Sequence, residues 1–370
     1  MKVILCTPYI QSDKYVQGGV VVWGANIVNY YKSIGKSDVE LIPISLDRKT
    51  YFESHTSKIG GYVNGAKELL LPVLKAINLM HKGGIDAIHI ATSLGASVLK
   101  DELLLRAAKH YGVRSYLHFH CGRVPDILSN NDMEHKKFLK NLRMATKGIT
   151  MDVRSYDALR DYGISNVVNL PNPLSLSIMN EVSKKSKTIK KVKGRIAFVG
   201  HVLKSKGCME LIESCCKIGS PDLHIIGKVM SKDKEEIDKL LAAYHTGGSW
   251  ITWTGEIPHH QVIEELLAAE IFAFPSYTEG FPNVILEAMA CGCTIVSTTV
   301  GAIPEMLDVE GDACGVCVVP QNADAFYQAL DTVYHRNGAN LDYAHQAKER
   351  VFRLYAVDKV WEQMVRIWHS

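Results

Sequence analysis

The chain has 370 residues, of which 47% are hydrophobic and 22% are charged, and its formal net charge is +3. This length suits two domains of ordinary size, and so small a charge argues against nucleic acid as the main partner. No apolar run approaches the roughly 18–20 residues that span a bilayer, and the first residues hold an apolar stretch too short for a signal peptide. We therefore expect a cytoplasmic globular protein.

The first half of the chain predicts alternating strands and helices, which is typical of a parallel α/β sheet. The expected strands cover 3–7, 39–45, 87–90 and 114–119, and the expected helices cover 20–33 and 94–111. Segment 47–67 is rich in Tyr, Ser, Gly and Lys and has no clear period, so we predict a long loop there. A strand and a proline-bounded turn over 163–173 close this half.

Two sets of residues recur at helical spacing shortly before this turn. The basic set is Lys136, Lys140, Arg143 and Lys147, and the apolar set on the other side is Phe138, Leu142 and Ala145. Such a pattern predicts a helix with one buried face. Two interpretations of the basic stripe stay open: a solvated face, or a patch that attracts anionic lipid.

The histidines and cysteines give little support for a metal site. His118 and His120 stand two apart on a strand and hence on one face, as zinc ligands can, but no obvious further ligands complete a site. The nine cysteines are spread along the chain and form no disulfide framework. Apolar neighbours indicate that Cys314 and Cys317 are buried structural thiols rather than zinc ligands.

The second half follows a basic segment, 184–195, which contains no acidic residue and is predicted to be a solvated linker. Expected strands cover 196–199, 223–226 and 250–253, and helices begin near 208 and cover 325–335, 341–355 and 357–369. The last of these helices carries bulky apolar residues at helical intervals: Trp361, Met364, Val365 and Trp368.

The densest motif of the chain runs from Ile271 to Glu305, with the sequence IFAFPSYTEGFPNVILEAMACGCTIVSTTVGAIPE. A short apolar strand over 271–274 leads into a glycine-containing loop, and a helix over 283–290 follows with Pro282 in its first turn. A second buried strand covers 294–297, and another short helix begins at Pro304. This order of strand, loop, helix and strand is a unit of a parallel α/β sheet.

The chemistry of this motif lies where the loop meets the helix. A helix start exposes unpaired N–H groups and partial positive charge, which favours an anion, and Gly280 lets a ligand approach the backbone. Glu279 and Glu287 would repel a phosphate, but each carboxylate can accept hydrogen bonds from sugar hydroxyls. The combination indicates a site for a nucleotide sugar.

Two glutamates at this spacing, within EGFPNVILEAMACG and followed by GAIPE, resemble the signature of family 4 glycosyltransferases. That resemblance implies retaining enzymes of the α/β GT-B fold, in which two Rossmann-like domains face each other across a cleft. We accordingly expect an acceptor-side domain over 1–178 rejoined by a C-terminal helix over 356–370. The basic linker would then cover 179–194 and the nucleotide-sugar donor domain 195–355, with loop 47–67 shaping the acceptor site.

The resemblance also implies roles for individual residues. Lys206 matches a family lysine on the distal donor phosphate, whereas His201 stands where the family has an arginine. Glu287 would hold the ribose, and Glu279 and His120 would hold the sugar. Catalytic roles therefore fall to His120, Lys206 and Glu279. Substrate binding falls to Gly18, Gly19, His201, Gly227, Ile257, Gly280, Phe281, Asn283 and Glu287, with Gly227 and Ile257 on the base side.

The function implied is a metal-independent retaining hexosyltransferase without a cofactor, acting in cell-surface polysaccharide or glycolipid synthesis. Its donor would be a nucleotide sugar, UDP-linked rather than GDP-linked, and its acceptor a glycan or lipid-linked glycan. We expect it in the cytoplasm, peripherally on the inner face of the membrane. Two alternatives stay open: a sugar-nucleotide epimerase of the same fold, and a non-catalytic subunit that binds nucleotide sugar within a glycosyltransferase complex.

Overall fold

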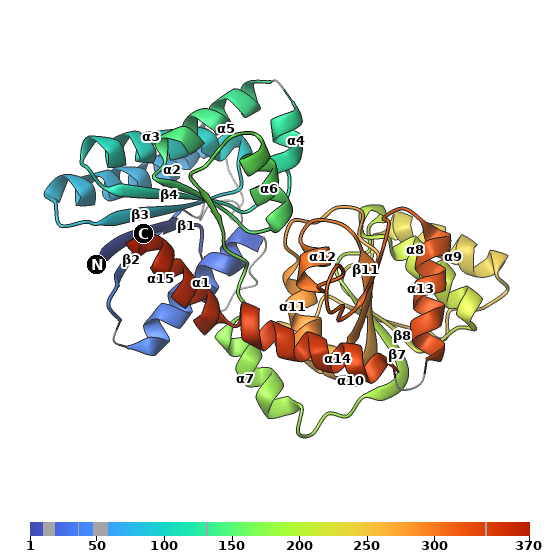
Figure 1. Cartoon of the computed structure of the whole chain (residues 1–370). Helices are drawn as coiled ribbons and strands as arrows, with labels where there is room; N and C mark the ends of the chain where they lie inside the picture. Colours follow the sequence, from blue (N-terminus) through green and yellow to red (C-terminus); the bar gives the residue numbers. More distant parts are fainter. Residues whose placement is uncertain (10–18, 36, 47–57, 131, 337–338) are drawn as a thin grey trace. The chain divides into compact units, whose positions relative to one another are not determined.

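A computed structural model describes residues 1–9, 19–35, 37–46, 58–130, 132–336 and 339–370 of the chain. The chain forms two compact units (Figure 1). The first unit contains Met1–Pro173 and Val357–Ser370, and the second contains Leu174–Ala356. Within the described ranges, the structure has no helix with both the length and the apolar character needed to cross a membrane.

The first unit is built on a six-stranded parallel sheet of order β2-β1-β3-β4-β5-β6. Its strands are β1 (Lys2–Thr7), β2 (Glu40–Ser45), β3 (Ala87–Thr92), β4 (Arg114–Phe119), β5 (Lys147–Thr150) and β6 (Val167–Asn169). Its helices are α1 (Gly19–Ile34), α2 (Lys58–Lys82), η2 (Gly95–Ser97), α3 (Val98–His110), α4 (Val124–Ser129), α5 (Met133–Met144), α6 (Val153–Asp161) and α15 (Val357–His369). The chain order changes direction between β1 and β3, and open α/β sheets bind ligands at the carboxyl ends of strands beside such a point.

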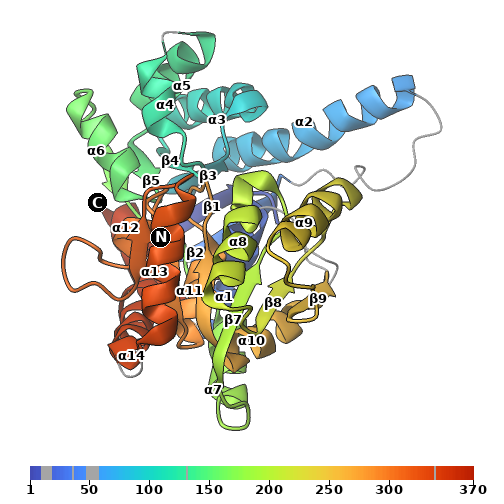
Figure 2. The same ribbon diagram turned by 90° about the vertical axis from the view of Figure 1, so that its right-hand side faces the viewer.

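Two hydrophobic cores cover the two faces of this sheet. One core joins the sheet to α1 and α15 and includes Trp23 and Trp368, both almost fully buried. The other joins it to α2, α3, α4 and α5 and includes Leu104 and Phe138. Helices α2 and α3 lie side by side over this second core (Figure 2).

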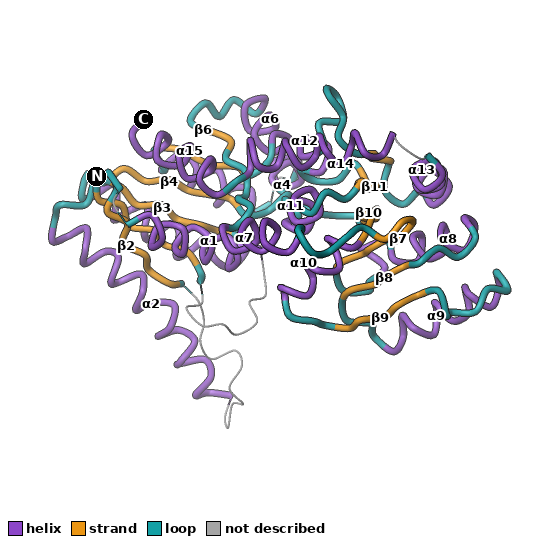
Figure 3. The backbone as a smooth tube through the Cα atoms, turned by 90° about the horizontal axis from the view of Figure 1, so that it is seen from below, coloured by secondary structure: helices purple, strands orange, loops and turns teal. Residues whose placement is uncertain are grey.

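The second unit repeats the architecture with sheet order β12-β11-β10-β7-β8-β9, and its strands are again parallel. Figure 3 shows strands β7 to β11 of this sheet beside their helices. Its strands are β7 (Val192–Val199), β8 (Leu223–Ile226), β9 (Ile251–Gly255), β10 (Ala269–Phe274), β11 (Thr294–Thr298) and β12 (Val316–Val318). Its helices are α7 (Leu176–Lys185), η3 (Lys204–Lys206), α8 (Cys208–Ile218), α9 (Ser231–Ala243), α10 (His259–Ala268), α11 (Asn283–Ala290), α12 (Ile303–Met306), α13 (Ala323–His335), α14 (Ala339–Arg350) and η4 (Val351–Tyr355). Helices α8, α9 and α13 form one group and α7, α10, α11 and α14 the other (Figure 1).

The structure corrects the predicted loop over 47–67. Residues 47–57 lie outside the described residues, but Lys58–Lys82 forms the long helix α2. Glycine lowers helix propensity by about 1 kcal/mol per residue, and Gly60, Gly61 and Gly65 hide the helical character of this segment from sequence reasoning. In the later part of the same helix, Val73, Ala76 and Met80 are buried.

The predicted linker over 179–194 is also corrected, because these residues are part of the second unit. They contain most of α7 and the start of β7. Lys191 is not solvated as a linker residue would be: its ammonium group donates to the backbone oxygens of Leu266, at 3.1 Å, and Ala269, at 2.6 Å. A lysine-rich sequence therefore does not distinguish lysines that are solvated from lysines, such as Lys191, that bind backbone carbonyl groups of the same unit.

Candidate functional site

The motif over 271–305 folds as its sequence predicts. Strand β10 ends at Phe274, helix α11 covers Asn283–Ala290 with Pro282 just before it, and β11 begins at Thr294. Strands β10 and β11 pair in parallel, so the connecting loop lies at the carboxyl edge of the second sheet. This edge is where parallel α/β sheets usually bind ligands.

Lys206 and Glu279 are brought together at this edge, from segments far apart in the sequence. The Lys206 ammonium lies 2.5 Å from Glu279 Oε1, and the Ser276 hydroxyl donates to the same oxygen at 2.7 Å. The ammonium also stands over the Phe274 ring, 5.5 Å from its centroid. The side chains of Lys206 and Glu279 are 29% and 13% exposed, so the ion pair is open to solvent mainly on the lysine side.

Two glycines allow the loops of this edge to approach each other. Gly207 has a φ of +68°, and a Cβ there would stand 2.1 Å from the Pro275 carbonyl oxygen. Gly301 has a φ of +54°, and a Cβ there would stand 2.3 Å from the Gly280 carbonyl oxygen. Both positions require glycine because a side chain would be strained and would collide with backbone. The loop that carries Glu279 can therefore pack closely against Gly207, which follows η3, on one side and against Gly301, which precedes α12, on the other.

Glu287 lies on the buried side of α11 and is paired with His259, the first residue of α10. The distance from His259 Nε2 to Glu287 Oε1 is 3.1 Å, and the carboxylate side chain is only 12% exposed. The hydrogen bond to Glu287 raises the pKa of His259 above its usual value. No local sequence motif indicates this pair, because its two residues belong to different helices.

The other predicted donor-side residues lie in the same unit. His201 is exposed and follows β7, and Gly227 follows β8 and donates its N–H to the Gly255 carbonyl at 2.9 Å. Ile257 is half-buried before α10. Phe281 is buried, with its ring centroid 5.9 Å from that of Tyr355. Asn283 is the first residue of α11.

The first unit holds the remaining predicted site residues. Gly19 begins α1, whereas Gly18 lies outside the described residues. His120 follows β4, and its backbone N–H donates to the Thr92 carbonyl at 2.7 Å. The His120 ring is packed against two neighbours, with centroid distances of 4.1 Å to His118 and 4.6 Å to Trp23.

His120 belongs to a group of three histidines, in which His89 and His118 are buried and His120 is half-buried. Burial lowers the pKa of His89 and of His120 to about 3, and it lowers the pKa of His118 well below the usual value. All three imidazoles are therefore neutral at physiological pH. Among the residues that the structure describes, no group of His, Cys, Asp or Glu side chains has the arrangement of a metal site.

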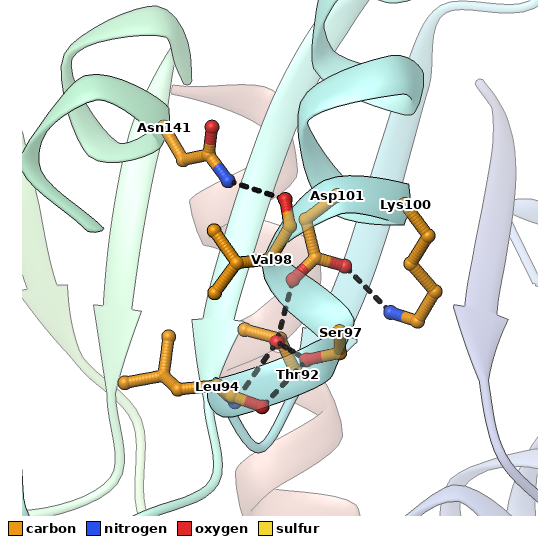
Figure 4. Close-up of polar contacts among 7 residues, drawn as sticks. All are labelled: Thr92, Leu94, Ser97, Val98, Lys100, Asp101 and Asn141. Atoms are coloured by element: carbon orange, nitrogen blue, oxygen red, sulfur yellow. Dashed lines mark hydrogen bonds and ion pairs between the residues drawn. The ribbon is translucent and has the colours of Figure 1, made fainter. Parts of the chain in front are cut away.

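A polar network fixes the connection between β3 and α3, next to His120 along the same edge (Figure 4). The Thr92 hydroxyl donates to Asp101 Oδ2 at 2.6 Å, and the Leu94 N–H donates back to the Thr92 hydroxyl at 3.2 Å. The Lys100 ammonium lies 2.5 Å from Asp101 Oδ1. Leu94 has a φ of +65°, which is rare for a residue with a side chain, and this network holds it there.

The predicted basic stripe is partly confirmed. Phe138, Leu142 and Ala145 are buried, and Lys136, Lys140 and Arg143 lie on α5 with their side chains exposed. Lys147 is not on that helix, because α5 ends at Met144; Lys147 instead begins β5, and its ammonium donates to the Ser370 hydroxyl at 2.6 Å. The three remaining basic residues line an open cavity of about 390 Å³ together with His135 and Leu139.

Of the two thiols in the second unit that were predicted to be buried, one is buried and the other is half-buried. Cys314 is buried, and Cys317 on β12 is half-buried. Burial raises the pKa of Cys314 to about 11 and that of Cys317 to about 12, so both are protonated at physiological pH. Both cysteines are free of disulfides.

Comparisons with known proteins bear on both units. Residues 179–350, nearly the whole second unit, match the family model described as glycosyl transferases group 1. The chain is 31% identical over 139 residues to the putative teichuronic acid biosynthesis glycosyltransferase TuaC of Bacillus subtilis, which covers 37% of this chain and 32% of TuaC. It is 32% identical over 184 residues to alpha-maltose-1-phosphate synthase of Mycolicibacterium smegmatis, which covers 47% of each chain. The matches thus span less than half the length of these relatives.

Among solved structures, HepE of Anabaena in complex with UDP is similar with a TM-score of 0.71 and 16% sequence identity, over 99% of both chains. The predicted fold class is confirmed: two Rossmann-like α/β units of the GT-B type. The match to the family model indicates, more narrowly, a second unit of the kind found in group 1 glycosyl transferases.

Proposed function

We propose that this chain is a retaining glycosyltransferase of family 4 that transfers a hexosyl group from a nucleotide sugar. The observation that carries the proposal is the Lys206–Glu279 pair at the carboxyl edge of the second sheet, directly before the start of α11. Relatives named as glycosyltransferases and the similarity to a structure that contains UDP support it. The acceptor would be a glycan or lipid-linked glycan; the relative TuaC is named for teichuronic acid biosynthesis.

The chemistry of this edge suits a departing nucleoside diphosphate. Negative charge develops on the leaving phosphate, so the main demand on the protein is positive charge that is already in place. Lys206 supplies it, and the N–H groups at the start of α11 add partial positive charge. In the free protein Glu279 satisfies the lysine. When donor binds, phosphate oxygens would share Lys206 while Glu279 accepts from a sugar hydroxyl.

Glu287 is suited to the ribose of the same donor. His259 engages Oε1, which leaves Oε2 of the carboxylate to accept from a hydroxyl group. The pair also orients the carboxylate before ligand binds, so less freedom is lost on binding. His120, Gly19, Gly280 and Phe281 would contact the sugar and the phosphates, and Gly227 and Ile257 the base. No metal or cofactor has a role in this proposal, and UDP is the expected nucleotide.

Donor turnover separates this proposal from the two alternatives. The full chain is incubated with UDP-linked and GDP-linked hexoses, with and without a lipid-linked or glycan acceptor, and released nucleotide and product are measured. A transferase forms glycosylated acceptor, an epimerase forms free sugar without any acceptor, and a non-catalytic subunit shows binding alone. Stabilisation in a thermal shift assay identifies the donor first, since ligand at a hundred times its Kd adds about 2.7 kcal/mol to the free energy of unfolding.

We also propose that the exposed face of α5 and the neighbouring helices docks on anionic membrane. Lys136 and Arg143 supply charge, and so does Lys140, although the Lys140 ammonium lies 2.6 Å from Glu102 Oε1 of α3. Helix α3 contacts both α5 and α2, and apolar side chains are exposed on α3, at Leu99 and Leu103, and on α2, at Leu70, Leu71 and Leu74. Exposed apolar side chains beside cations are typical of proteins that bind a membrane surface. This face would bring the first unit to a lipid-linked acceptor.

Vesicle sedimentation tests the membrane face. Replacing Lys136, Lys140 and Arg143 by glutamine should reduce binding to vesicles that contain phosphatidylglycerol, since each basic residue contributes about 1 kcal/mol near such a surface. A matched control replaces three exposed lysines of α9 in the second unit: Lys232, Lys234 and Lys239. If the α5 variant sediments as the wild type does, the basic stripe is only a solvated face.

A further inference from the structure

Two of the three grouped histidines, His89 and His118, are linked by hydrogen bonds to a tryptophan of the C-terminal helix. Trp368 Nε1 donates to His89 Nδ1 at 3.1 Å, and His89 Nε2 lies 3.2 Å from His118 Nδ1. The residues come from α15, β3 and β4, which all belong to the same compact unit. The hydrogen-bonded series therefore runs from Trp368 on α15 to His118 on β4, the strand that His120 follows.

The hydrogen-bonded series Trp368–His89–His118 has only one consistent arrangement of protons. The indole nitrogen of tryptophan is a donor and never an acceptor, so His89 Nδ1 must present its lone pair. A neutral His89 then carries its proton on Nε2 and donates it to His118 Nδ1. A neutral His118 in turn carries its proton on Nε2. One fixed donor, Trp368, thus sets the tautomer of two histidines in sequence.

Packing holds this chain in place. Trp23 of α1 stacks on His89, with centroids 5.5 Å apart, and meets His118 edge to face at 5.0 Å. The Tyr116 hydroxyl donates to the Trp368 carbonyl at 2.9 Å and so fixes the end of α15 on β4. All of these side chains are buried. Neutral imidazoles suit such surroundings, because burial without an acidic partner disfavours their charged form.

His120 is the end of this arrangement that is available for a ligand. Among the residues that the structure describes, its Nδ1 and Nε2 and the Nε2 of His118 have no hydrogen-bond partner, although all three atoms are buried. Buried polar atoms without a hydrogen-bond partner are uncommon in folded proteins, so these atoms indicate a place where a ligand could supply one. The ring of His118 lies against that of His120, so its orientation limits the orientation of His120.

We propose that Trp368, His89 and His118 are positioning residues for His120, and that they hold it neutral and oriented toward a hydroxyl-bearing ligand. Trp368 and His89 act through His118, and neither of them touches the substrate. The inference rests on the proposed function for its effect on transfer. The proton arrangement itself does not depend on any activity.

Nitrogen NMR of the full chain labelled with ¹⁵N-histidine tests the arrangement directly. We expect His89 and His118 each to be neutral and to carry the proton on Nε2 at pH 7. In the Trp368→Phe variant, which keeps an aromatic ring but lacks the donor, both should lose this single tautomer. A matched control is Trp361→Phe on the same helix, since Trp361 packs on Trp368, at a centroid distance of 5.7 Å, and is not part of the chain. Protonation of His118 on Nδ1 in the wild type, or equal spectra for wild type and Trp368→Phe, would overturn the proposal.

Kinetics then test the consequence for His120. Loss of one buried hydrogen bond should lower kcat in Trp368→Phe by about three- to tenfold, with the KM for donor within about twofold of wild type. His89→Phe should have a similar effect, and the double variant should be little worse than either single one, because the chain acts as a unit. Fully additive losses, or a rise in KM alone, would overturn the positioning role. Absence of turnover in the wild type would instead count against the proposed function, and the NMR result would stand apart from it.

Discussion

The carboxyl edges of the two sheets carry opposite kinds of polar group. In the second unit the side chains are ionic, with Lys206 paired to Glu279 and His259 paired to Glu287. In the first unit His118 and His120 lie at this edge and His89 lies further back in β3, and all three are neutral, since burial lowers their pKa far below physiological pH. A diphosphate requires charge, whereas hydroxyl groups are well served by neutral donors and acceptors. This difference agrees with the proposed division into a donor side in the second unit and a sugar or acceptor side in the first.

The first unit does contain charges near its edge, but they are placed for structure. Lys100 and Asp101 are a buried pair at 2.5 Å, with side chains 10% and 1% exposed. Burial raises the pKa of Asp101 in spite of the lysine. The contrast with Lys206 is that neither partner of this pair is open to a ligand, so it orients the β3–α3 connection and is unavailable for phosphate.

The largest effect should follow from breaking this buried pair. Lys100→Met should lower the free energy of unfolding by about 3–5 kcal/mol, because it leaves the Asp101 carboxylate buried without a partner of opposite charge. The folded state already holds the Asp101 proton more tightly than the unfolded state, so its stability falls as pH rises above the unfolded pKa. The loss in Lys100→Met should therefore be larger at pH 7 than at pH 4, as measured by urea denaturation. The neutral double variant Lys100→Met/Asp101→Asn is the control and should recover most of the stability; if it does not, the lysine acts through packing.

The next effect tests the ionic edge of the second unit. Lys206→Ala should lower kcat for transfer by about a hundredfold, because a preorganised charge at the leaving phosphate is lost. Lys204→Ala is the matched control, since Lys204 lies on the same short helix η3 with its side chain exposed. Steady-state kinetics with the donor found by thermal shift gives the answer. Equal rates for both variants would place the diphosphate elsewhere.

Glu287→Ala should weaken binding of nucleotide sugar and of nucleoside diphosphate by the same factor, because both carry the ribose. A charged hydrogen-bond acceptor contributes about 1.5–3 kcal/mol. Isothermal titration calorimetry measures both affinities. Glu279→Gln is the counterpart: it should spare diphosphate binding and reduce turnover. Unchanged affinity in Glu287→Ala would remove this residue from the site, and weak diphosphate binding in Glu279→Gln would show that the two glutamates do not divide the donor in this way.

The sequence predicted those features of this site that depend on neighbouring residues, and it did not predict contacts between segments that are far apart in the chain. Strand β10, helix α11 and strand β11 follow from apolar runs and a proline that lie next to one another in the chain, and the prediction of α11 has the observed bounds. The Lys206–Glu279 pair joins residues 73 positions apart, and only the resemblance to a family placed both in one site. The His259–Glu287 pair and the Trp368–His89 contact have no such signal, since they depend on how separate elements pack. The start of helix α2 was missed because Gly60, Gly61 and Gly65 lower the helix propensity of its first turns.

The smallest effect should come from His259, which would sharpen the comparison by showing that a titrating group supports the ionic edge. The hydrogen bond to Glu287 raises the pKa of His259, so the folded protein keeps the histidine charged to higher pH than the unfolded chain does. The support it gives to the Glu287 carboxylate is therefore complete below the ordinary histidine pKa and is lost as pH rises through the raised value. The His259 side chain is 54% exposed, so solvent screens the pair and the effect is modest. We expect His259→Gln to bind nucleoside diphosphate about two- to threefold more weakly than wild type at pH 6, on the scale of an exposed ion pair. At pH 9 the variant should bind nucleoside diphosphate as tightly as wild type. His260→Gln, at the exposed neighbouring position, should match wild type at both pH values. Parallel pH profiles for wild type and His259→Gln in calorimetric titrations would show that Glu287 holds the ribose without help from the histidine.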